Sequence, residues 1–228
     1  EPLFTAESLN SIFLNKNLKP YRKDLAKSRE LLKQEGFYWD KKGRLFDKYN
    51  NRVEFDLYTN AGNTEREAIG VMVKQDLEDL GMKVNFKPVE FNSLVNKLAN
   101  TLDWDMVIMG LTGSPLEPNS GKNVWHSRGT LHMFNQRLEK DKKDDRFDWE
   151  KRLDEIYDKG ALAIDFNERK KYYDEYQQIA YDEKPFIYIY SPIVITAIRD
   201  KFKNVFPTTL GGATHNIEEI YIDKEGRK

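Results

Sequence analysis

Cysteine is absent from the 228-residue sequence. Its absence excludes disulfide bonds, thiolate catalysis, Cys-ligated zinc and iron–sulfur clusters, and leaves histidines and carboxylates as the only side chains able to ligate a metal. An excess of basic charge is also missing, since 37 Lys and Arg residues oppose 38 Asp and Glu residues. Proteins that bind nucleic acid by neutralising phosphates usually carry such an excess, so no nucleic-acid partner is expected.

Long apolar runs are missing too. No stretch approaches the ~20 apolar residues that span a bilayer, and the N-terminus lacks the basic start and apolar run of a signal peptide. The sequence opens at Glu1 without an initiating Met, so we expect a processed or excised chain and infer no location from the missing signal. What is present, 39% hydrophobic and 13% aromatic residues, is typical of a folded globular protein.

The first half of the chain alternates helical and strand patterns. Capping residues such as Asp24 and Asn63 or Thr64 precede apolar residues at helical spacing, and Gly36 and Gly81 follow them. The predicted elements are helices over 24–36, 63–80 and 91–98 and strands over 53–58, 82–87 and 106–109. The last strand is apolar throughout, which is typical of a central strand covered on both faces. This order predicts an α/β layer with a mixed or mostly parallel sheet flanked by helices.

The second half is less regular. Residues 111–146 contain glycines and prolines among aromatic and polar residues, too long a stretch for a simple connector. Amphipathic helices are predicted around 149–157 and 167–180, the second ended by Pro185. Strands are predicted over 186–190, 193–198 and 220–222.

Few residues suggest catalysis. His126 and His132 are not spaced as helical metal ligands, and no serine or glycine pattern matches a hydrolase or a phosphate-binding loop. We therefore expect loop hydrogen bonds for these histidines, and no metal ion or cofactor. Asp103 and Asp105 point the same way along a strand, as do the metal-binding acids of some glycosyltransferases. The alternative is that both acids simply begin the strand.

Polar and aromatic loops follow two of the predicted strands, at 59–63 and 111–125. In open α/β sheets, ligands bind at the carboxyl ends of strands, where helix N-termini direct hydrogen-bond donors outward. We expect a binding cleft there, with hydrogen bonds from Asn60, Asn63, Thr112 and Ser114. Tyr58 and Trp125 would form flat walls, although a core position under the long loop suits Trp125 equally well.

Segments spread along the chain resemble the C-terminal lobe of bacterial family 5 extracellular solute-binding proteins, the oligopeptide, dipeptide and nickel receptors of ABC importers. The resemblance depends on the order and spacing of motifs over nearly all 228 residues. They include Leu18-Lys19-Pro20-Tyr21, Thr59-Asn60-Ala61-Gly62-Asn63 with Arg66, Leu80-Gly81-Met82-Lys83-Val84, Asp103-Trp104-Asp105 continuing to Gly110, Asn123-Val124-Trp125-His126-Ser127-Arg128-Gly129 and Pro185-Phe186-Ile187-Tyr188.

The resemblance implies one lobe of a type II periplasmic-binding-protein fold over residues 1–228, with both ends near a hinge to a missing N-terminal lobe. It implies a non-enzymatic monomer that binds a peptide-like solute between two lobes and delivers it to ABC permease subunits. The implied location is extracytoplasmic, in the periplasm or lipid-anchored at the outer face of the cytoplasmic membrane.

One departure concerns the ligand. In the peptide receptors, the loop after the strand ending at Gly110 commonly has the pattern Gly-Trp-x-x-Asp, and its Asp holds the peptide's α-amino group. Here Leu111 takes the Trp place and Ser114 the Asp place, so a different anchor or solute class stays open. The predicted ligand-binding residues are Asn60, Asn63, Arg66, Leu111, Thr112, Gly113, Ser114 and Trp125. The alternative functions are a metal-dependent glycosyltransferase using Asp103 and Asp105, and a receptor-like lobe recruited for sensing.

Overall fold

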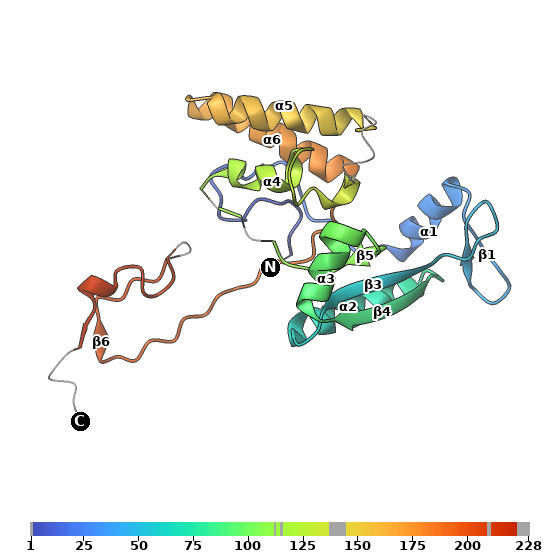
Figure 1. The fold of residues 1–228 in the computed structure, drawn as a ribbon, viewed down its shortest axis with the longest axis horizontal. Helices are drawn as coiled ribbons and strands as arrows, with labels where there is room; N and C mark the ends of the chain where they lie inside the picture. The colour runs from blue at the N-terminus through green and yellow to red at the C-terminus, as the bar shows by residue number, and fades with distance from the viewer. Residues whose placement is uncertain (1, 112, 115, 137–144, 209–210, 223–228) are drawn as a thin grey trace. The chain divides into compact units, whose positions relative to one another are not determined.

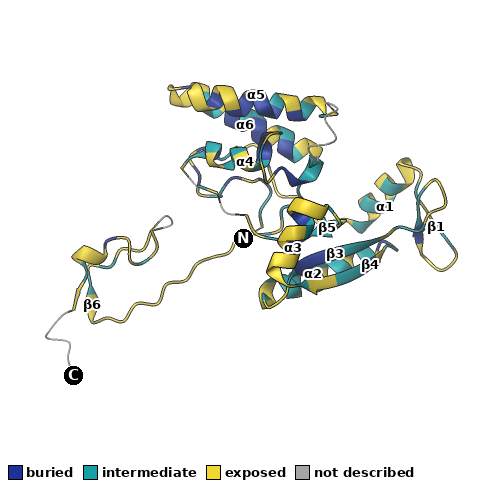
Figure 2. Ribbon diagram, in the orientation of Figure 1, coloured by how far each residue is buried: buried dark blue, intermediate teal, exposed yellow. Residues whose placement is uncertain are grey.

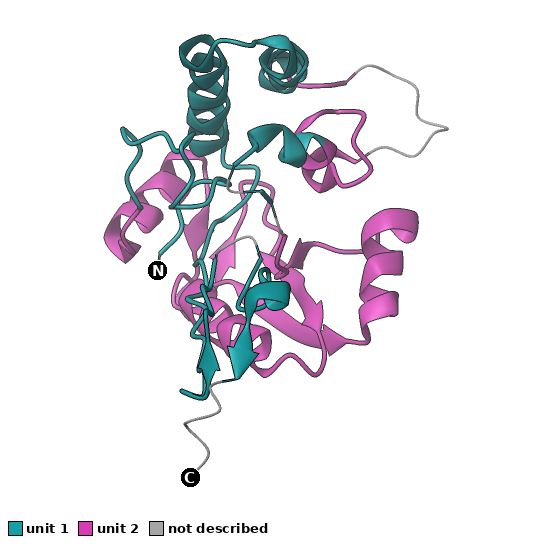
Figure 3. Ribbon diagram, turned by 90° about the vertical axis from the view of Figure 1, so that its left-hand side faces the viewer, with its two compact units in different colours: residues 1–20, 113–122, 148–228 teal, residues 21–112, 123–147 magenta. Residues whose placement is uncertain are grey.

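A computed structural model of the chain describes residues 2–111, 113–114, 116–136, 145–208 and 211–222 (Figure 1). The chain divides into two compact units, coloured separately in Figure 3. Unit 1 comprises residues 1–20, 113–122 and 148–228, and unit 2 comprises residues 21–112 and 123–147. Each unit is described by itself.

Unit 2 is built on a parallel sheet of three strands in the order β4-β3-β5. The central strand β3 (Glu54–Asn60) pairs with β4 (Lys83–Val89) over its whole length and with β5 (Met106–Val107) at Leu57 and Tyr58. The connections are the helix α2 (Thr64–Glu78) and the helix α3 (Phe91–Asn96), which continues into the π-helical turn η1 (Lys97–Thr101). The predicted alternation of strands and helices is confirmed.

Two apolar clusters cover the two faces of this sheet. Successive side chains of a strand point to opposite faces, so Leu57 and Tyr58 of β3 belong to different clusters. On one face, Leu57, Val84 and Ile108 pack against Ile69, Val73 and Leu77 of α2. On the other, Tyr58 packs with Leu94 of α3, Leu98 of η1 and Met133. The middle of β3 is accordingly coloured as buried in Figure 2.

The strand near residue 106 differs from its prediction. Its side chains do reach both clusters, since Ile108 lies in one and Val107 packs against the other. However, within the described residues β5 lies at the edge of the sheet and β3 at its centre. An apolar run therefore indicated coverage on both faces, but not a neighbour on both sides.

Local capping signals place the helices of unit 2. Asp24 accepts a hydrogen bond from the amide of Lys27 and begins α1 (Leu25–Gln34), and Asn63 caps α2 in the same way. Gly36 follows α1 with a φ of +87°, a conformation that favours glycine. Between α1 and β3, the sequence forms a small antiparallel hairpin of β1 (Tyr38–Trp39) and β2 (Leu45–Phe46), which was not predicted.

Unit 1 contains two long helices, α5 (Asp148–Leu162) and α6 (Phe166–Glu183), which pack against each other. The prediction of two amphipathic helices here is confirmed. Their shared core holds Leu153, Ile156 and Tyr157 of α5 and Tyr173 and Tyr176 of α6, all buried.

The N-terminal segment, residues 2–20, is attached to α6 through Gln177. The side-chain oxygen of Gln177 accepts a hydrogen bond from the amide of Asn15 at 2.9 Å, and its nitrogen donates to the carbonyl of Phe13 at 2.8 Å. Buried polar groups require such partners, so this glutamine holds the segment in place.

The strands predicted over 186–190 and 193–198 are not formed. Apart from one isolated bridge between Pro2 and Tyr190, these residues have no strand partner in the described part of the chain. In 193–198 the apolar side chains face solvent, with Val194 85% and Ile195 89% exposed, whereas Phe186, Tyr188 and Tyr190 are partly buried. The β-branched composition was identified correctly, but a strand also needs a neighbour to pair with.

The remaining described elements are short. They are η2 (Pro118–Gly121), α4 (Lys122–Trp125), η3 (Met133–Asn135), η4 (Ile217–Glu219), and an antiparallel pair of β6 (Phe202–Lys203) and β7 (Tyr221–Ile222). The last of these confirms the strand predicted near residue 221. In the described residues, every helix is too short or too polar to cross a membrane.

Candidate ligand-binding site

The carboxyl end of β3 leads directly into the N-terminus of α2. Asn60 is the last residue of β3, and Asn63 caps the helix through a 2.9 Å hydrogen bond from the amide of Arg66. Glu67 accepts a further hydrogen bond from the amide of Gly62 at 2.8 Å. The predicted capping signal is thereby confirmed, and the side-chain oxygen of Asn63 is occupied by the helix.

Arg66 supplies a positive charge at the carboxyl edge of the sheet. Its Nη1 donates a 2.7 Å hydrogen bond to Oδ1 of Asn60, and the side chain is half-buried. Among the described residues, no Asp or Glu forms an ion pair with Arg66. A guanidinium has five N–H donors, and the helix N-terminus beside it carries a positive partial charge. This arrangement suits an anionic group.

Gly110 permits the close approach of Arg66. A Cβ built on Gly110, shortly after β5, would lie 2.9 Å from Nη2 of Arg66. A side chain at this position would therefore displace the guanidinium. The structure brings together Asn60, Arg66 and Gly110. Gly110 was not among the predicted site residues, although a glycine directly after an apolar strand is a signal that could have identified it.

The other predicted loop residues belong to different units or lie outside the described residues. Leu111 is 45% exposed in unit 2, and Thr112 lies outside the described residues. Gly113 and Ser114 belong to unit 1. The amide of Ser114 donates to Oγ of Ser120 at 3.0 Å, and its own hydroxyl accepts from the amide of Leu116 at 3.2 Å. Ser114 thus stabilises its own turn.

The two aromatic residues expected to line the cleft are buried in unit 2. Trp125 is 3% exposed and its ring centroid lies 5.8 Å from that of Phe134. Tyr58 packs in the sheet core, donates a 2.9 Å hydrogen bond to Asp56, and has its pKa raised by burial. Both rings therefore take core positions in this unit, which is the alternative stated above for Trp125.

Asp103 and Asp105 have separate partners. Asp103, with a side chain 77% exposed, forms an ion pair with Lys97 at 2.5 Å. Asp105 accepts a 2.9 Å hydrogen bond from the amide of Asp56, one residue before the β3–β5 ladder begins. Asp105 therefore extends the pairing of β5 with a side chain, which supports the interpretation that it begins the strand.

Nothing in the described part of the chain resembles a metal centre. No group of three or more His, Asp or Glu side chains there is arranged to hold an ion. The histidines make loop hydrogen bonds as predicted, His126 accepting from the amide of Arg128 at 3.1 Å. Nδ1 of His132 lies 3.0 Å from the carbonyl of Val124.

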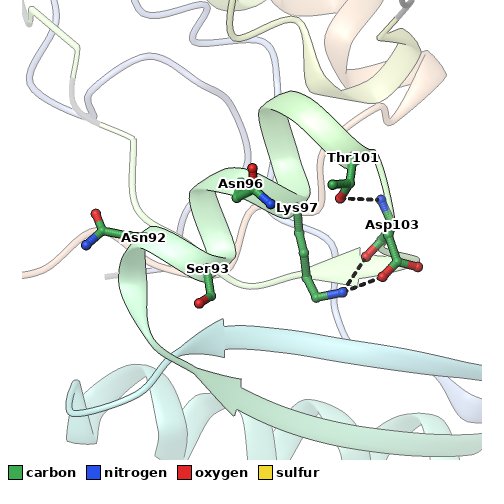
Figure 4. A pocket seen from close by; sticks show the side chains of 6 residues that line it. All are labelled: Asn92, Ser93, Asn96, Lys97, Thr101 and Asp103. Atoms are coloured by element: carbon green, nitrogen blue, oxygen red, sulfur yellow. Dashed lines mark hydrogen bonds and ion pairs between the residues drawn. The ribbon is translucent and has the colours of Figure 1, made fainter.

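An open polar pocket lies along α3 and η1 (Figure 4). It is lined by Asn92, Ser93, Asn96, Lys97, Thr101 and Asp103. The charge of Lys97 is balanced by Asp103, and the close-up shows the two side chains in contact. None of the predicted site residues lines this pocket, so it is not the candidate site.

Comparison with known proteins gives curated relatives of one kind. A probable ABC transporter-binding protein from Deinococcus radiodurans is 27% identical over 221 residues, covering 90% of this chain and 36% of the relative. The oligopeptide-binding protein AppA of Bacillus subtilis is 28% identical over 173 residues, covering 73% of this chain and 29% of AppA. The chain thus spans about a third of the length of these relatives.

Solved structures share the fold. AppA from Bacillus subtilis, in complex with a nonapeptide, matches with a TM-score of 0.74 at 22% identity and covers 98% of this chain and 43% of its own. AppA from Clostridium difficile matches with a TM-score of 0.75 at 17% identity, covering 97% of this chain and 42% of its own. MelB from Agrobacterium fabrum, in complex with stachyose, matches with a TM-score of 0.73 at 18% identity. The match covers 82% of this chain and 29% of MelB.

These likenesses confirm the periplasmic-binding-protein fold predicted from the sequence. Residues 5–130, more than half of the chain, match the family model of the bacterial extracellular solute-binding proteins, family 5 Middle. The chain therefore belongs to family 5 of the bacterial extracellular solute-binding proteins.

Proposed function

We propose that the chain is the C-terminal lobe of a substrate-binding receptor of an ABC importer. In this proposal the receptor holds a peptide-like solute non-covalently in a cleft between two lobes and delivers it to a membrane permease. Two findings support it: membership of family 5, and similarity to relatives named as an ABC transporter-binding protein and an oligopeptide-binding protein. No support exists for the glycosyltransferase alternative, because Asp103 and Asp105 bind different partners.

The main structural support for this proposal is that Arg66 is held in place by Asn60 but forms no ion pair within the described residues. It lies at the carboxyl edge of a parallel sheet, where ligands of α/β proteins bind, and it is fixed by Asn60 without a carboxylate partner in the described residues. Charge-assisted hydrogen bonds from a guanidinium to a carboxylate are strong and directional. We therefore assign Arg66 to a carboxylate of the solute, which a peptide supplies. This anchor does not depend on the aspartate that Ser114 replaces.

The exposed segment 193–198 supports a second lobe. A chain segment with Ile193, Val194 and Ile195 all facing water is apolar on both of its faces, which is typical of a strand buried inside a sheet. In our proposal the segment pairs with the part of the receptor that this chain does not include, and both ends of the chain lie near the hinge. Closure of the two lobes about that hinge would signal that the solute is bound.

The proposed location and partners are inferred from membership of the family. The family is described as extracellular, and we place the receptor outside the cytoplasm, in the periplasm or lipid-anchored at the outer face of the membrane. Its partners in the proposal are the solute, the N-terminal lobe and the ABC permease subunits, with the receptor acting as a monomer. Gly113, Ser114, Leu111, Thr112 and Trp125 stay predicted members of the site.

Calorimetry on the full-length receptor tests the proposal. Replacing Arg66→Ala should weaken binding of a peptide with a free carboxyl terminus by roughly 10- to 100-fold, the equivalent of about 1.5–3 kcal/mol for a charge-assisted bond. The loss should shrink for the same peptide amidated at its C-terminus. Arg44→Ala is the control, because Arg44 pairs with Asp40 in the β1–β2 turn. Equal affinities for Arg66→Ala and the unaltered receptor would contradict the assignment.

A further inference from the structure

A carboxyl group is buried inside unit 1 without a cation to balance it. Glu7 lies in segment 2–20, is 6% exposed, and receives hydrogen bonds from the hydroxyls of Tyr176 and Ser11. No Lys, Arg or His of the described residues is paired with it. Burial of an ionised carboxylate is costly unless a counter-charge or several donors compensate. The surroundings of Glu7 therefore favour its neutral form.

The groups that face Glu7 come from every element packed around it. Tyr157 belongs to α5, Tyr173 and Tyr176 belong to α6, and Tyr188 follows α6; each interacts electrostatically with the Glu7 carboxyl. Three of the rings form edge-on pairs, with centroids 5.3 Å apart for Tyr157 and Tyr176 and 6.1 Å apart for Tyr157 and Tyr173. Phenols are neutral near pH 7, so this cage supplies no positive charge.

Arg169 of α6 forms an ion pair with another carboxylate, that of Glu117. Nη2 of Arg169 lies 2.7 Å and 2.6 Å from the two carboxylate oxygens of Glu117. Glu117 precedes η2 and accepts a hydrogen bond from the amide of Asn119. Its negative charge therefore opposes ionisation of Glu7 rather than assisting it. Burial, with this repulsion added, raises the pKa of Glu7 from 4.5 to about 7, although the hydroxyls of Tyr176 and Ser11 act in the other direction.

Ionisation of Glu7 would weaken the docking of segment 2–20 on the helix pair. Glu7 is carried by segment 2–20, whereas the tyrosines are carried by α5, α6 and the residue stretch after α6. Moving the segment away from α6 would return the carboxylate to water. Contacts that resist this movement include the hydrogen bonds of Gln177 with Thr5, Phe13 and Asn15. The ring of Phe13 also packs against Phe166 and Tyr173 of α6.

We propose that Glu7 is a proton-controlled clasp, in which the neutral carboxyl keeps segment 2–20 docked on α6 and loss of the proton loosens the segment. The docked state has the higher affinity for the proton. Its added stability is complete below a pH of about 4.5, declines as the pH rises, and is lost above about 7. No ligand takes part, so the clasp can be tested separately from the proposed function.

Hydrogen exchange in the 228-residue chain measures the docking directly. The amide of Asn15, bonded to Gln177, reports on the segment, and the amides of α2 in unit 2 serve as an internal reference. After correction for the intrinsic exchange rate, we expect protection of Asn15 to fall on the order of 10- to 100-fold between pH 5 and pH 8. In Glu7→Gln, which keeps a neutral polar group, protection should stay constant over the same range.

A carboxyl titration followed by 13C NMR needs no variant and gives an independent readout. We expect the Glu7 resonance to titrate with a midpoint near 7, well above the ordinary glutamate value of about 4.3. Glu183→Gln is the matched control for exchange and should retain the pH dependence of the unaltered chain. A Glu7 midpoint near 4.3, or the same pH dependence of Asn15 protection in Glu7→Gln as in the unaltered chain, would overturn the proposal.

Discussion

The Nη1 atom of Arg66 lies 2.7 Å from Oδ1 of Asn60, so the first turn of α2 is joined to the last residue of β3 by a side-chain bond. The backbone amide of the same arginine donates to Asn63, which caps the helix. Arg66 is thus held at both its backbone and its side chain. A cation fixed in this way loses little conformational freedom when it binds an anion, and such preorganisation favours affinity.

Substitution of Gly110→Ala should test the position of this guanidinium. The added methyl group would lie 2.9 Å from Nη2 of Arg66 and displace the end of a flexible side chain rather than the backbone. We therefore expect a small change in the free energy of unfolding, below about 1 kcal/mol, with a larger loss of solute affinity in the full-length receptor. Thermal unfolding and calorimetry on the same variant separate the two effects. An affinity unchanged by Gly110→Ala would mean that the ligand does not contact Arg66.

Substitution of Gly70→Ala should destabilise unit 2 despite the better helix propensity of alanine. Gly70 is the buried residue of α2, and an added Cβ would overlap the ring of Phe86 on β4. The propensity gain of up to about 1 kcal/mol should be outweighed by overpacking, for a net loss of roughly 1–2 kcal/mol in chemical denaturation. In a Phe86→Ala background the same substitution should be neutral or stabilising. A stabilising effect with Phe86 in place would show that the ring moves freely.

Features determined by neighbouring residues in the sequence were predicted well. Asp24 and Asn63 cap helices through amides three residues away, and the apolar spacing of α2 follows from its contact with the sheet. The edge position of β5 depends on which strands are adjacent in the fold, and composition does not contain that information. The prediction of a strand over 193–198 was wrong for the same reason, because composition does not show whether a neighbouring strand is present.

The binding site itself stays a prediction, and the structure shows only where its residues lie. The family resemblance supplied Arg66, whereas the argument from strand ends supplied Asn60, because carboxyl ends of parallel strands are where helix N-termini gather. The argument from strand ends also assigned Tyr58 and Trp125 to the cleft, whereas unit 2 buries both rings, since an aromatic side chain near a loop satisfies a core position equally well. The approach of Arg66 to Gly110 joins residues 44 positions apart and has no local signature.

Loss of the Gln177 side chain should be costly for unit 1. Its oxygen accepts from Asn15 and Thr5 and its nitrogen donates to Phe13, so Gln177→Ala leaves a buried amide of Asn15 without a partner. We expect the free energy of unfolding to fall by roughly 2–4 kcal/mol, measured by denaturant titration. Within the described residues, the side chain of the neighbouring Gln178 bonds to the exposed Asp182, and Gln178→Ala should cost less than about 0.5 kcal/mol. Similar losses for the two variants would contradict the role of Gln177.

Variants of Asp105 distinguish a role in strand pairing from a role in metal binding. Asp105→Ala removes the acceptor for the amide of Asp56 and should lower stability by about 1 kcal/mol, while Asp105→Asn retains an acceptor and should cost less. Calorimetric titration with Mn²⁺ should give no saturable binding in the unaltered chain. Saturable binding that Asp105→Ala abolishes would instead revive the glycosyltransferase alternative.

Hydrogen exchange over 193–198 should distinguish the isolated lobe from the complete receptor. In the structure this segment has no strand partner among the described residues, and side chains such as Val194 and Ile195 are exposed, so its amides should exchange near their intrinsic rates in the 228-residue chain. If the segment pairs with the N-terminal lobe, the same amides should exchange at least about tenfold more slowly in the full-length receptor, because strand hydrogen bonds must open first. The amides of α2 should exchange alike in both proteins and show that unit 2 is unchanged. Equal rates over 193–198 in the two proteins would mean that the apolar segment is not a strand of the second lobe.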